Sequence, residues 1–263
     1  RDDIEIAPPG PGEARVRIVA SGVCHSDLSV LNGTIPLPTP IVLGHEGAGV
    51  VEEIGEGVSR IAVGDHVVLS FVPACGECYT CKHDQAYLCE QSAAQAAAGL
   101  LDGTTRLTSQ GAPLHQMACL GTFGTHAIVP EISMVKIPED VPLDIASLIG
   151  CGVLTGIGAA LNTADIKAGD TVAVIGCGGV GLNVIQGAKI AGATTIIAVD
   201  MRVSYGRFKP RVTFEKVCPS SRAQSHPCAK LALRAELSSD LRWSPTGSCF
   251  MSVPMWCWVL FNM

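Results

Sequence analysis

The chain has 263 residues, of which 48% are hydrophobic and 16% are charged, and this composition excludes an intrinsically disordered protein. Its length suggests one large or two ordinary domains. The formal net charge of −6 at pH 7 argues against a nucleic-acid partner, because such partners select basic surfaces. We also expect no membrane partner, no secretory leader and a cytoplasmic location, since no apolar run reaches the length of a bilayer span.

The first part of the chain, residues 1–150, is predicted to be mostly β. Residues 13–20 alternate between apolar and polar side chains, as a half-buried strand does. Further strand-like runs, separated by glycine turns, follow at residues 49–54, 65–69, 123–129 and 134–137. Residues 24–31 are expected to form a short helix or loop. Residues 91–122 are low in charge and rich in turn residues, so we expect surface loops there.

From residue 144 onward the pattern changes to that of an α/β protein. A helical pattern over residues 144–160 comes first, and a strand–turn–helix–strand series follows at residues 171–175, 176–181, 182–191 and 195–200. Both strands are apolar along nearly their whole length, as in a parallel sheet that is covered on both faces. The predicted fold class is therefore α/β with a mostly β N-terminal domain.

Residues 201–263 are a different kind of sequence. Residues 1–200 carry 9 lysines and arginines against 21 aspartates and glutamates, a net charge of −12, whereas residues 201–263 carry 9 against 3, a net charge of +6. The later segment also holds all three tryptophans and has no isoleucine. We assign it to no domain.

Four of the 12 cysteines follow the pattern Cys-x2-Cys-x2-Cys-x7-Cys; they are Cys75, Cys78, Cys81 and Cys89. Four thiolates in so short a segment can surround one zinc ion as a tetrahedron and leave no open position, which is the arrangement of a structural metal. The alternative is four free or paired cysteines in a loop. The spacing favours zinc, and with it a reducing compartment.

A second metal site can be assembled from residues far apart in the sequence. Cys24, His45 and Cys151 would give zinc two thiolates and one imidazole, with a fourth position for water or substrate. Asp27 would accept the second ring proton of His45 and fix its tautomer, and Glu46 would lie behind the metal or exchange onto it. Each cysteine taken alone is more simply a small buried apolar residue. Their joint occurrence is what favours a metal.

A glycine-rich turn fits the dinucleotide-binding pattern Gly-x-Gly-x-x-Gly, with Gly176, Gly178, Gly179, Val180 and Gly181 as its members. It follows a predicted strand and opens a predicted helix, whose N-terminus would face the pyrophosphate of the cofactor. Asp200, 19 residues after the last glycine, would bind the adenosine ribose and repel a 2′-phosphate, which favours NAD over NADP. The alternative is a glycine-rich turn that binds no nucleotide.

Together these features resemble the zinc-dependent alcohol dehydrogenases of the medium-chain dehydrogenase/reductase family. The resemblance runs from about residue 4 to Asp200 and includes the short motifs at residues 22–27, 44–46, 102–106 and 150–152. It implies a GroES-like zinc-binding catalytic domain over residues 1–150 and a partial Rossmann NAD-binding domain over residues 151–200. It also implies NAD in the cleft between the domains and a homo-oligomer, either a dimer or a tetramer.

The resemblance implies a role for each candidate residue. One zinc held by Cys24, His45 and Cys151 would stabilise the alkoxide of a small alcohol, whose hydride passes to NAD as the aldehyde or ketone forms. The second zinc of the chain would be structural. Ser26 would take the proton of the alcohol. The remaining roles are a pyrophosphate contact for His25, a wall of the substrate pocket for Phe71 and a place beside the nicotinamide for Thr155.

Two departures from the family pattern bear on the substrate. Many members end their proton relay in a histidine five residues after the first cysteine ligand; Ser29 stands there in this chain, so the proton must leave differently. S-(hydroxymethyl)glutathione dehydrogenases, which oxidise the formaldehyde adduct, carry an arginine near the position of Ala93, and this chain has no arginine between Cys89 and Arg106. An ordinary alcohol is favoured over that adduct. A third alternative is a catalytically inactive zinc-binding chain that pairs with a full-length partner.

No family resemblance is visible after Asp200. Our hypothesis is that residues 201–263 arise from a retained intron, an alternative exon or a frameshift. Genomic sequence with normal family coding directly after the Asp200 codon would support this origin. An uninterrupted gene whose homologues carry related tails would exclude it.

The sequence predicts weak or no NAD binding by this chain. A single strand–helix–strand unit leaves apolar strand edges exposed and lacks most of the cofactor contacts of a full Rossmann domain. Isothermal titration of the chain with NADH should therefore show no measurable heat of binding at micromolar concentrations. A micromolar affinity would contradict the prediction.

Overall fold

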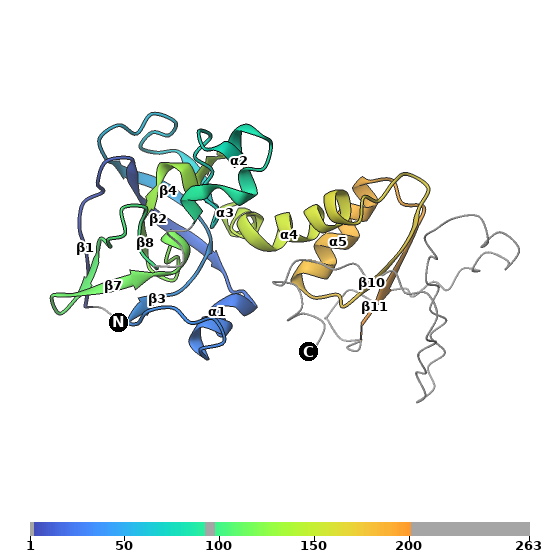
Figure 1. The fold of residues 1–263 in the computed structure, drawn as a ribbon, viewed down its shortest axis with the longest axis horizontal. Coiled ribbons are helices and arrows are strands. Elements are labelled where there is room, and N and C mark those ends of the chain that lie inside the picture. Colours follow the sequence, from blue (N-terminus) through green and yellow to red (C-terminus); the bar gives the residue numbers. More distant parts are fainter. Residues whose placement is uncertain (1–2, 93–97, 201–263) are drawn as a thin grey trace, which may run out of the picture. The chain divides into compact units, whose positions relative to one another are not determined.

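The computed structural model describes residues 3–92 and 98–200 (Figure 1). The described residues divide into two compact units, one up to Gly152 and one from Val153 onward. The GroES-like fold class that we predicted for the first part is confirmed by its β-sheets and by the relatives described below. The assignment of residues 151–200 and 201–263 to separate domains stays a prediction.

The first unit is built on a five-stranded antiparallel sheet. Its strand order is β8–β2–β4–β5–β9, with bounds Glu13–Gly22 for β2, Glu46–Ile54 for β4, His66–Leu69 for β5, His126–Pro130 for β8 and Met134–Lys136 for β9. All five overlap the strands predicted from alternating apolar residues. The central pair, β2 and β4, places Gly22 opposite Glu46, so the end of one strand lies beside the start of the other.

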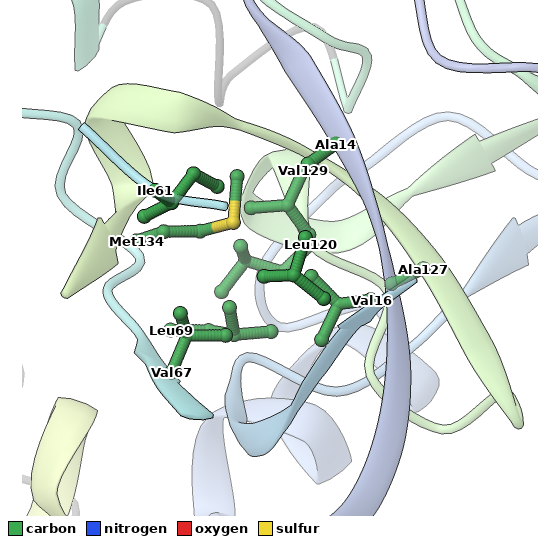
Figure 2. Packing of buried hydrophobic residues seen from close by; sticks show 10 residues of the cluster. Ala14, Val16, Ile61, Val67, Leu69, Leu120, Ala127, Val129 and Met134 are labelled. Atoms are coloured by element: carbon green, nitrogen blue, oxygen red, sulfur yellow. The ribbon is translucent and has the colours of Figure 1, made fainter. Parts of the chain in front are cut away.

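The core of this unit lies against one face of that sheet. Figure 2 shows side chains from several strands meeting there, among them Val16 of β2, Leu69 of β5 and Val129 of β8. Leu120 reaches the same cluster from a loop, and Met134 from the start of β9. These side chains are almost completely buried, and burying each contributes about 1.5–3 kcal/mol.

A second, four-stranded sheet has the order β1–β6–β7–β3, with bounds Ile4–Ile6, Leu107–Ser109, Ala112–Gln116 and Ile41–Val42. Strands β6 and β7 form a hairpin whose two loop residues, Gln110 and Gly111, both have positive φ. The prediction of surface loops over residues 91–122 is therefore wrong for residues 107–116, which form β6 and β7, whereas residues 98–106 contain no helix or strand and residues 93–97 lie outside the described part of the chain. Low charge there reflects burial, since Leu100, Leu114 and Leu120 are in the interior.

Short helices connect the strands of the first unit. The α-helices are α1 (His25–Leu31), α2 (Tyr79–Lys82) and α3 (Leu143–Ala146), and the 3-10 turns are η1 (Ala86–Leu88), η3 (Met117–Cys119) and η4 (Glu131–Ser133). The helix predicted over residues 144–160 is confirmed as a helical stretch whose hydrogen bonding changes along its length. Helix α3 is followed by the π-helix η5 (Ile149–Val153), α4 (Leu154–Gly158) and the π-helix η6 (Ala159–Thr163), and Ser147, Val153 and Ala159 at the junctions keep right-handed helical φ and ψ. Four glycines in this stretch lower its helix propensity.

The described part of the second unit contains one strand–helix–strand element. Strand β10 (Thr171–Ile175) and strand β11 (Thr195–Val199) pair in parallel, and α5 (Gly179–Ile190) connects them. Both predicted strands and the helix between them are confirmed. Helix α5 also packs on the preceding helical stretch, where a side chain at Gly187 would come within 2.7 Å of Ala160. Among the residues described in either unit, no helix is long and apolar enough to cross a membrane.

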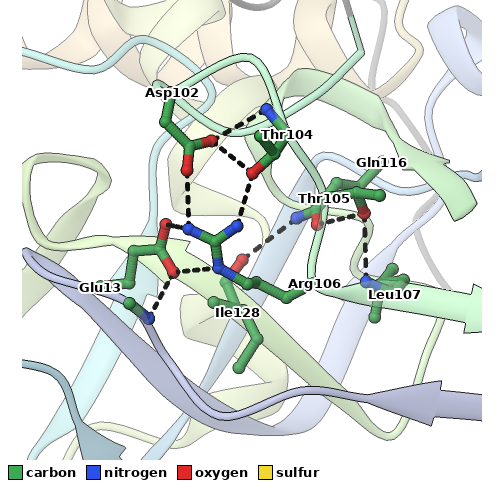
Figure 3. Close-up of polar contacts among 9 residues, drawn as sticks. Glu13, Asp102, Thr104, Thr105, Arg106, Leu107, Gln116 and Ile128 are labelled. Carbon is green, nitrogen blue, oxygen red and sulfur yellow. Dashed lines mark hydrogen bonds and ion pairs between the residues drawn. The ribbon is translucent and has the colours of Figure 1, made fainter.

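An ion-pair network ties the start of β2 to the segment before β6 (Figure 3). The Arg106 guanidinium donates to both carboxylate oxygens of Glu13, at 3.0 and 2.9 Å, and to Asp102 at 2.7 Å. Its side chain is only 18% exposed, and the Glu13 side chain is buried more deeply. The Asp102 carboxylate also accepts bonds from the backbone and hydroxyl of Thr104. Removing one partner would leave a charge without compensation.

We predict that Arg106→Gln lowers the free energy of unfolding of the first unit by about 1–3 kcal/mol, because Glu13 loses a largely buried cation. Urea unfolding of the full chain followed by circular dichroism measures the change. The matched control is Arg17→Gln, which breaks the pair with Glu52 where the Arg17 side chain is 47% exposed, and which should cost less than about 0.5 kcal/mol. Equal costs for both variants would contradict the prediction.

The same network predicts a pH dependence. Burial raises the pKa of Asp102, but hydrogen bonds from Arg106 and Thr104 outweigh it and lower the pKa to about 2. An unfolded aspartate has a pKa of about 3.9, so this stabilisation is complete above that pH and is lost as the pH falls through about 2. The difference in stability between the unmodified chain and Arg106→Gln should therefore shrink between pH 4 and pH 2.

Candidate metal centres and cofactor turn

The four-cysteine motif forms a compact lobe around α2 and η1. The sulfur atoms of Cys75, Cys78, Cys81 and Cys89 all lie within 4.8 Å of one another. The Cys75–Cys81 and Cys78–Cys89 sulfur pairs are each 3.9 Å apart. A tetrahedral zinc with Zn–S bonds of about 2.3 Å would place its sulfurs about 3.8 Å apart. All four cysteines are free of disulfides, and their geometry fits one zinc ion.

Donors around this lobe favour a thiolate at Cys78. A backbone donor at Gly76 lowers the pKa of Cys81, but burial and the three neighbouring sulfurs outweigh it and raise that pKa to about 12. The backbone N–H groups of Glu77 and Cys78 donate to the Cys75 sulfur at 3.4 and 3.3 Å, and the Cys75 N–H donates to Cys89. The hydroxyl of Thr80 lies 3.2 Å from the Cys78 sulfur and is the main cause that lowers the pKa of Cys78 to about 5. A cluster with these donors is prepared to hold a cation through sulfur.

The second predicted metal site is also brought together. One ligand atom from each of Cys24, His45, Glu46 and Cys151 lies within 4.8 Å of the other three. Cys24 precedes α1, His45 and Glu46 stand where β4 begins, and Cys151 lies in η5. The donor set of two sulfurs, one imidazole and one carboxylate suits zinc. All four residues belong to the first unit.

Asp27 binds the two backbone segments that carry these ligands. One carboxylate oxygen accepts from the Gly44 N–H and from the His45 Nδ1, each at 3.1 Å, and the other accepts from the Cys24 N–H at 2.9 Å. A carboxylate only accepts, so Nδ1 carries a proton and Nε2 is the ring nitrogen left for a metal. Burial lowers the pKa of His45, but the bonds with Asp27 and Cys24 outweigh it and raise that pKa to about 9, so a metal at Nε2 would displace a proton. Burial raises the pKa of Asp27, but the bonds from His45, Cys24 and Gly44 together outweigh it and the net shift is downward.

The charges of the cluster are strongly linked. The hydrogen bond from Cys151 lowers the pKa of Cys24 to about 3, and the same bond raises the pKa of Cys151. Burial, together with the Cys24 thiolate, raises the pKa of Glu46 to about 7. The interior therefore holds several groups that compete for protons. A bound divalent cation would release those protons and take their place.

Glycines give this cluster its room. A side chain at Gly22 would overlap the Glu46 carboxylate, and one at Gly150 would overlap the backbone of Leu69. Gly44 has φ +96°, a left-handed conformation that glycine adopts without strain, and a side chain there would overlap Thr122. Replacing any of the three would push a metal-ligand segment out of place.

The other predicted residues of the first unit lie close to these ligands. The Ser26 hydroxyl is 3.7 Å from the Cys24 sulfur, and the Phe71 ring packs edge-on against the His45 ring at 5.8 Å between centroids. The His25 Nδ1 lies 3.3 Å from the Ser29 hydroxyl. Ser29, which stands where the family pattern has a histidine, is thus a partner of His25.

The predicted cofactor turn lies in the second unit. Gly176 has φ +91°, and a side chain at Gly181 would overlap the carbonyl of Gly176, so both positions require glycine. Gly178 caps α5 and Gly179 begins it, and a side chain on either would meet open space. The Asp200 carboxylate accepts from the Cys177 N–H at 2.6 Å, which fixes it beside the turn.

Two more predicted cofactor residues lie near this turn. Thr155 lies in the first turn of α4, next to Gly156. A side chain at Gly156 would come within 2.5 Å of the Val180 carbonyl, so α4 approaches the start of α5 closely. The structure thus brings Thr155 and Val180 into one small region of the second unit. Their contact with NAD stays a prediction.

Sequence reasoning missed two residues at the metal cluster, Ser21 and Thr122. Their hydroxyls contact the backbone carbonyl of Glu46, at 2.7 and 3.3 Å. Thr122 lies 76 positions away from Glu46 in the sequence, and a threonine in a glycine-rich loop carries no local signal of such a contact.

Comparisons with known proteins agree with this geometry. Residues 10–139 match the family described as the alcohol dehydrogenase GroES-like domain. A putative alcohol dehydrogenase D of Mycobacterium tuberculosis is 40% identical over 241 residues, which are 92% of this chain and 63% of that protein. The chain thus spans less than two thirds of this curated relative. At least 41 of the matched residues lie after Asp200, so the two chains align into the segment where we saw no resemblance, and its origin stays a hypothesis.

Two solved structures are similar to the described fold. The alcohol dehydrogenase zinc-binding domain protein of Burkholderia ambifaria has a TM-score of 0.71 and 42% sequence identity. The benzyl alcohol dehydrogenase of Acinetobacter calcoaceticus has a TM-score of 0.70 and 36% identity. Each match covers 76% of this chain and 54% of the other.

The contacts of Asp27 predict that Asp27→Asn weakens zinc binding at the cluster of Cys24, His45 and Cys151 by about 10- to 100-fold. The amide of asparagine keeps the shape of the side chain. It removes the negative charge that orients the His45 ring and balances the positive charge of that ring. Competition with a coloured chelator measures the affinity. Asp140→Asn, at an exposed aspartate, is the control and should leave the affinity unchanged. An unaltered affinity in Asp27→Asn would show that the carboxylate does not support the site.

Proposed function

Since the chain, through its GroES-like residues 10–139, belongs to the zinc-dependent alcohol dehydrogenases of the medium-chain dehydrogenase/reductase family, we propose that it interconverts a small alcohol and its aldehyde or ketone, with hydride transfer to or from NAD. The observation that carries this proposal is the convergence of Cys24, His45 and Cys151 on one point. Two sulfurs and one imidazole leave a fourth position, where substrate would exchange with the Glu46 carboxylate, as a catalytic zinc requires.

The two metal groups would have different tasks. When bound at Cys24, His45 and Cys151, zinc supplies a Lewis acid that stabilises an alkoxide. Four sulfurs at the Cys75–Cys89 lobe would fill the coordination sphere of the other ion, which supports a structural task there. We therefore propose two zinc ions per chain.

The chain's own residues would orient the substrate and move its proton. The Ser26 hydroxyl, beside the Cys24 sulfur, would accept the proton of the alcohol while it passes its own hydroxyl proton onward into a relay. Asp27 holds the His45 ring in one tautomer, and the Phe71 ring against it supplies an apolar wall for the substrate. His45 and Glu46 are each 4% exposed, so the part of the site that they line is shielded from bulk water.

The cofactor would be NAD. The close packing of Gly176 and Gly181 and the open space at Gly178 and Gly179 support a pyrophosphate at the start of α5. The carboxylate of Asp200, fixed beside that turn, would repel the 2′-phosphate of NADP. His25 and Thr155 would add contacts to the pyrophosphate and the nicotinamide.

The substrate would be an ordinary alcohol, and we keep the glutathione adduct of formaldehyde as the alternative. The absence of arginine between Cys89 and Arg106 supports the first. Turnover measured with and without glutathione distinguishes the two. We further propose a cytoplasmic protein that forms a dimer or tetramer as its family does.

A second candidate is a zinc-binding chain without catalytic activity that pairs with a full-length partner. The described part of the second unit contains a single pair of parallel strands, β10 and β11. Such a sheet offers a cofactor fewer contacts than the larger sheet of a complete Rossmann domain. In this candidate the chain would bind metal at the cluster without catalysing a reaction there.

The proposal predicts two zinc ions per chain by elemental analysis. It also predicts NADH production from ethanol, benzyl alcohol or a longer alcohol, at NAD concentrations far above micromolar because the single pair of parallel strands would bind the cofactor weakly. The Cys151→Ala chain should keep one zinc and lose activity, because the four-cysteine lobe does not depend on Cys151. Two zinc ions with no NADH from any alcohol would contradict the enzyme proposal and favour the inactive candidate. A stoichiometry below one zinc per chain would contradict both.

A further inference from the structure

Two hydroxyl groups contact the backbone at the metal cluster without touching a ligand atom. Ser21 Oγ lies 2.7 Å from the Glu46 carbonyl oxygen, Thr122 Oγ1 lies 3.3 Å from the same oxygen, and the two hydroxyl oxygens are 2.8 Å apart. Each hydroxyl has one proton to donate. The two shortest contacts form a chain in which Thr122 donates to Ser21 and Ser21 donates to the carbonyl. Such chains strengthen each member by polarisation.

Thr122 is also fixed by its backbone. Its N–H donates to the Gly44 carbonyl, and the N–H of Phe123 donates to the Leu43 carbonyl, both at 3.0 Å. The loop that carries Thr122 therefore pairs with the segment that leads into His45. Thr122 is 1% exposed, so its hydroxyl has no water to replace a lost partner.

The side chain of Thr122 lies against both glycines that flank the two ligands. A side chain at Gly44 would overlap the Thr122 hydroxyl, and one at Gly47 would come within 2.7 Å of its methyl group. The hydroxyl of Thr122 thus packs against Gly44, and its methyl group packs against Gly47. Any shift of Thr122 would move the backbone between His45 and Gly47.

We propose that Thr122, together with Ser21, is a positioning residue for the metal centre. The two hydroxyls bind the carbonyl of the peptide group between Glu46 and Gly47. This contact fixes the backbone there, and with it the directions in which the side chains of His45 and Glu46 point. The Asp27 carboxylate orients the ring of His45, whereas the hydroxyls of Thr122 and Ser21 orient the backbone at Glu46. The inference rests on the proposed metal centre and extends it to residues outside the ligand set.

The test compares variants of the full chain at Thr122, Ser21 and two control positions. Thr122→Val keeps the shape and removes the hydroxyl, and Thr122→Ser keeps the hydroxyl. Thr105→Val is the matched control, because Thr105 also donates a hydroxyl bond to a buried backbone carbonyl, that of Leu114, at 2.6 Å. Zinc affinity is measured by competition with a coloured chelator, and the Cys151→Ala chain identifies which step belongs to the two-cysteine cluster. The absorption bands of cobalt in that cluster report its geometry.

Thr122→Val should weaken zinc binding at the two-cysteine cluster by about 10-fold or more and shift the cobalt bands, while the four-cysteine step stays unchanged. Thr122→Ser should stay within about threefold of the unmodified chain, and Thr105→Val should lower the melting temperature without changing either metal affinity. Ser21→Ala should weaken zinc binding at the two-cysteine cluster by about 10-fold. This variant tests the positioning role if Thr122→Val does not fold.

Unchanged zinc affinity and cobalt bands in Thr122→Val, with a melting temperature lowered as in Thr105→Val, would overturn the inference, since the hydroxyl would then support only the fold. An unmodified chain with zinc at the four cysteines alone would overturn it too. An unmodified chain that binds both ions but produces no NADH would contradict the proposed enzyme activity and leave the positioning role supported by the affinity data.

Discussion

The carboxylate of Asp27 is the contact on which the candidate catalytic site depends. It accepts from the backbone of Cys24, the backbone of Gly44 and the ring of His45. A buried charge is tolerated only with such partners, so the side chain and the two backbone segments stabilise one another. The pairing of β2 with β4 brings these segments together, because it places Gly22 opposite Glu46. Strand register thus determines which residues can share a metal.

Much of this arrangement could be predicted because its signals are local. The four cysteines lie close together in the sequence. The glycine turn directly follows an apolar strand and directly precedes a helical pattern, and this order is typical of a dinucleotide-binding turn. Cys24, His45 and Cys151 are distant from one another in the sequence and were grouped only because their side chains are zinc ligands. In the structure their ligand atoms lie within 4.8 Å of one another. The role of Asp27 followed from its ability to accept the second proton of a histidine ligand.

The failures have physical causes as well. Residues 107–116 form a hairpin, but its turn residues are Gln110 and Gly111, and glutamine is rare where φ is positive. The usual Asn-Gly or Asp-Gly signal is missing, so the segment was mistaken for loops. Ser21 and Thr122 could not be found because a hydroxyl bond to a backbone carbonyl depends on tertiary contacts alone. Asp200 was predicted to bind a ribose, and the structure adds a bond to the backbone of Cys177 that no sequence pattern indicated.

The two metal clusters differ in how far apart their ligands lie along the chain, and this sets an order for loading them. The ligands of the lobe lie between Cys75 and Cys89, so a growing chain can close that loop soon after it leaves the ribosome. The other cluster waits for Cys151, which follows the last strand of the five-stranded sheet. During synthesis the lobe could therefore bind a metal ion early, whereas the second cluster could bind one only after the surrounding domain has folded.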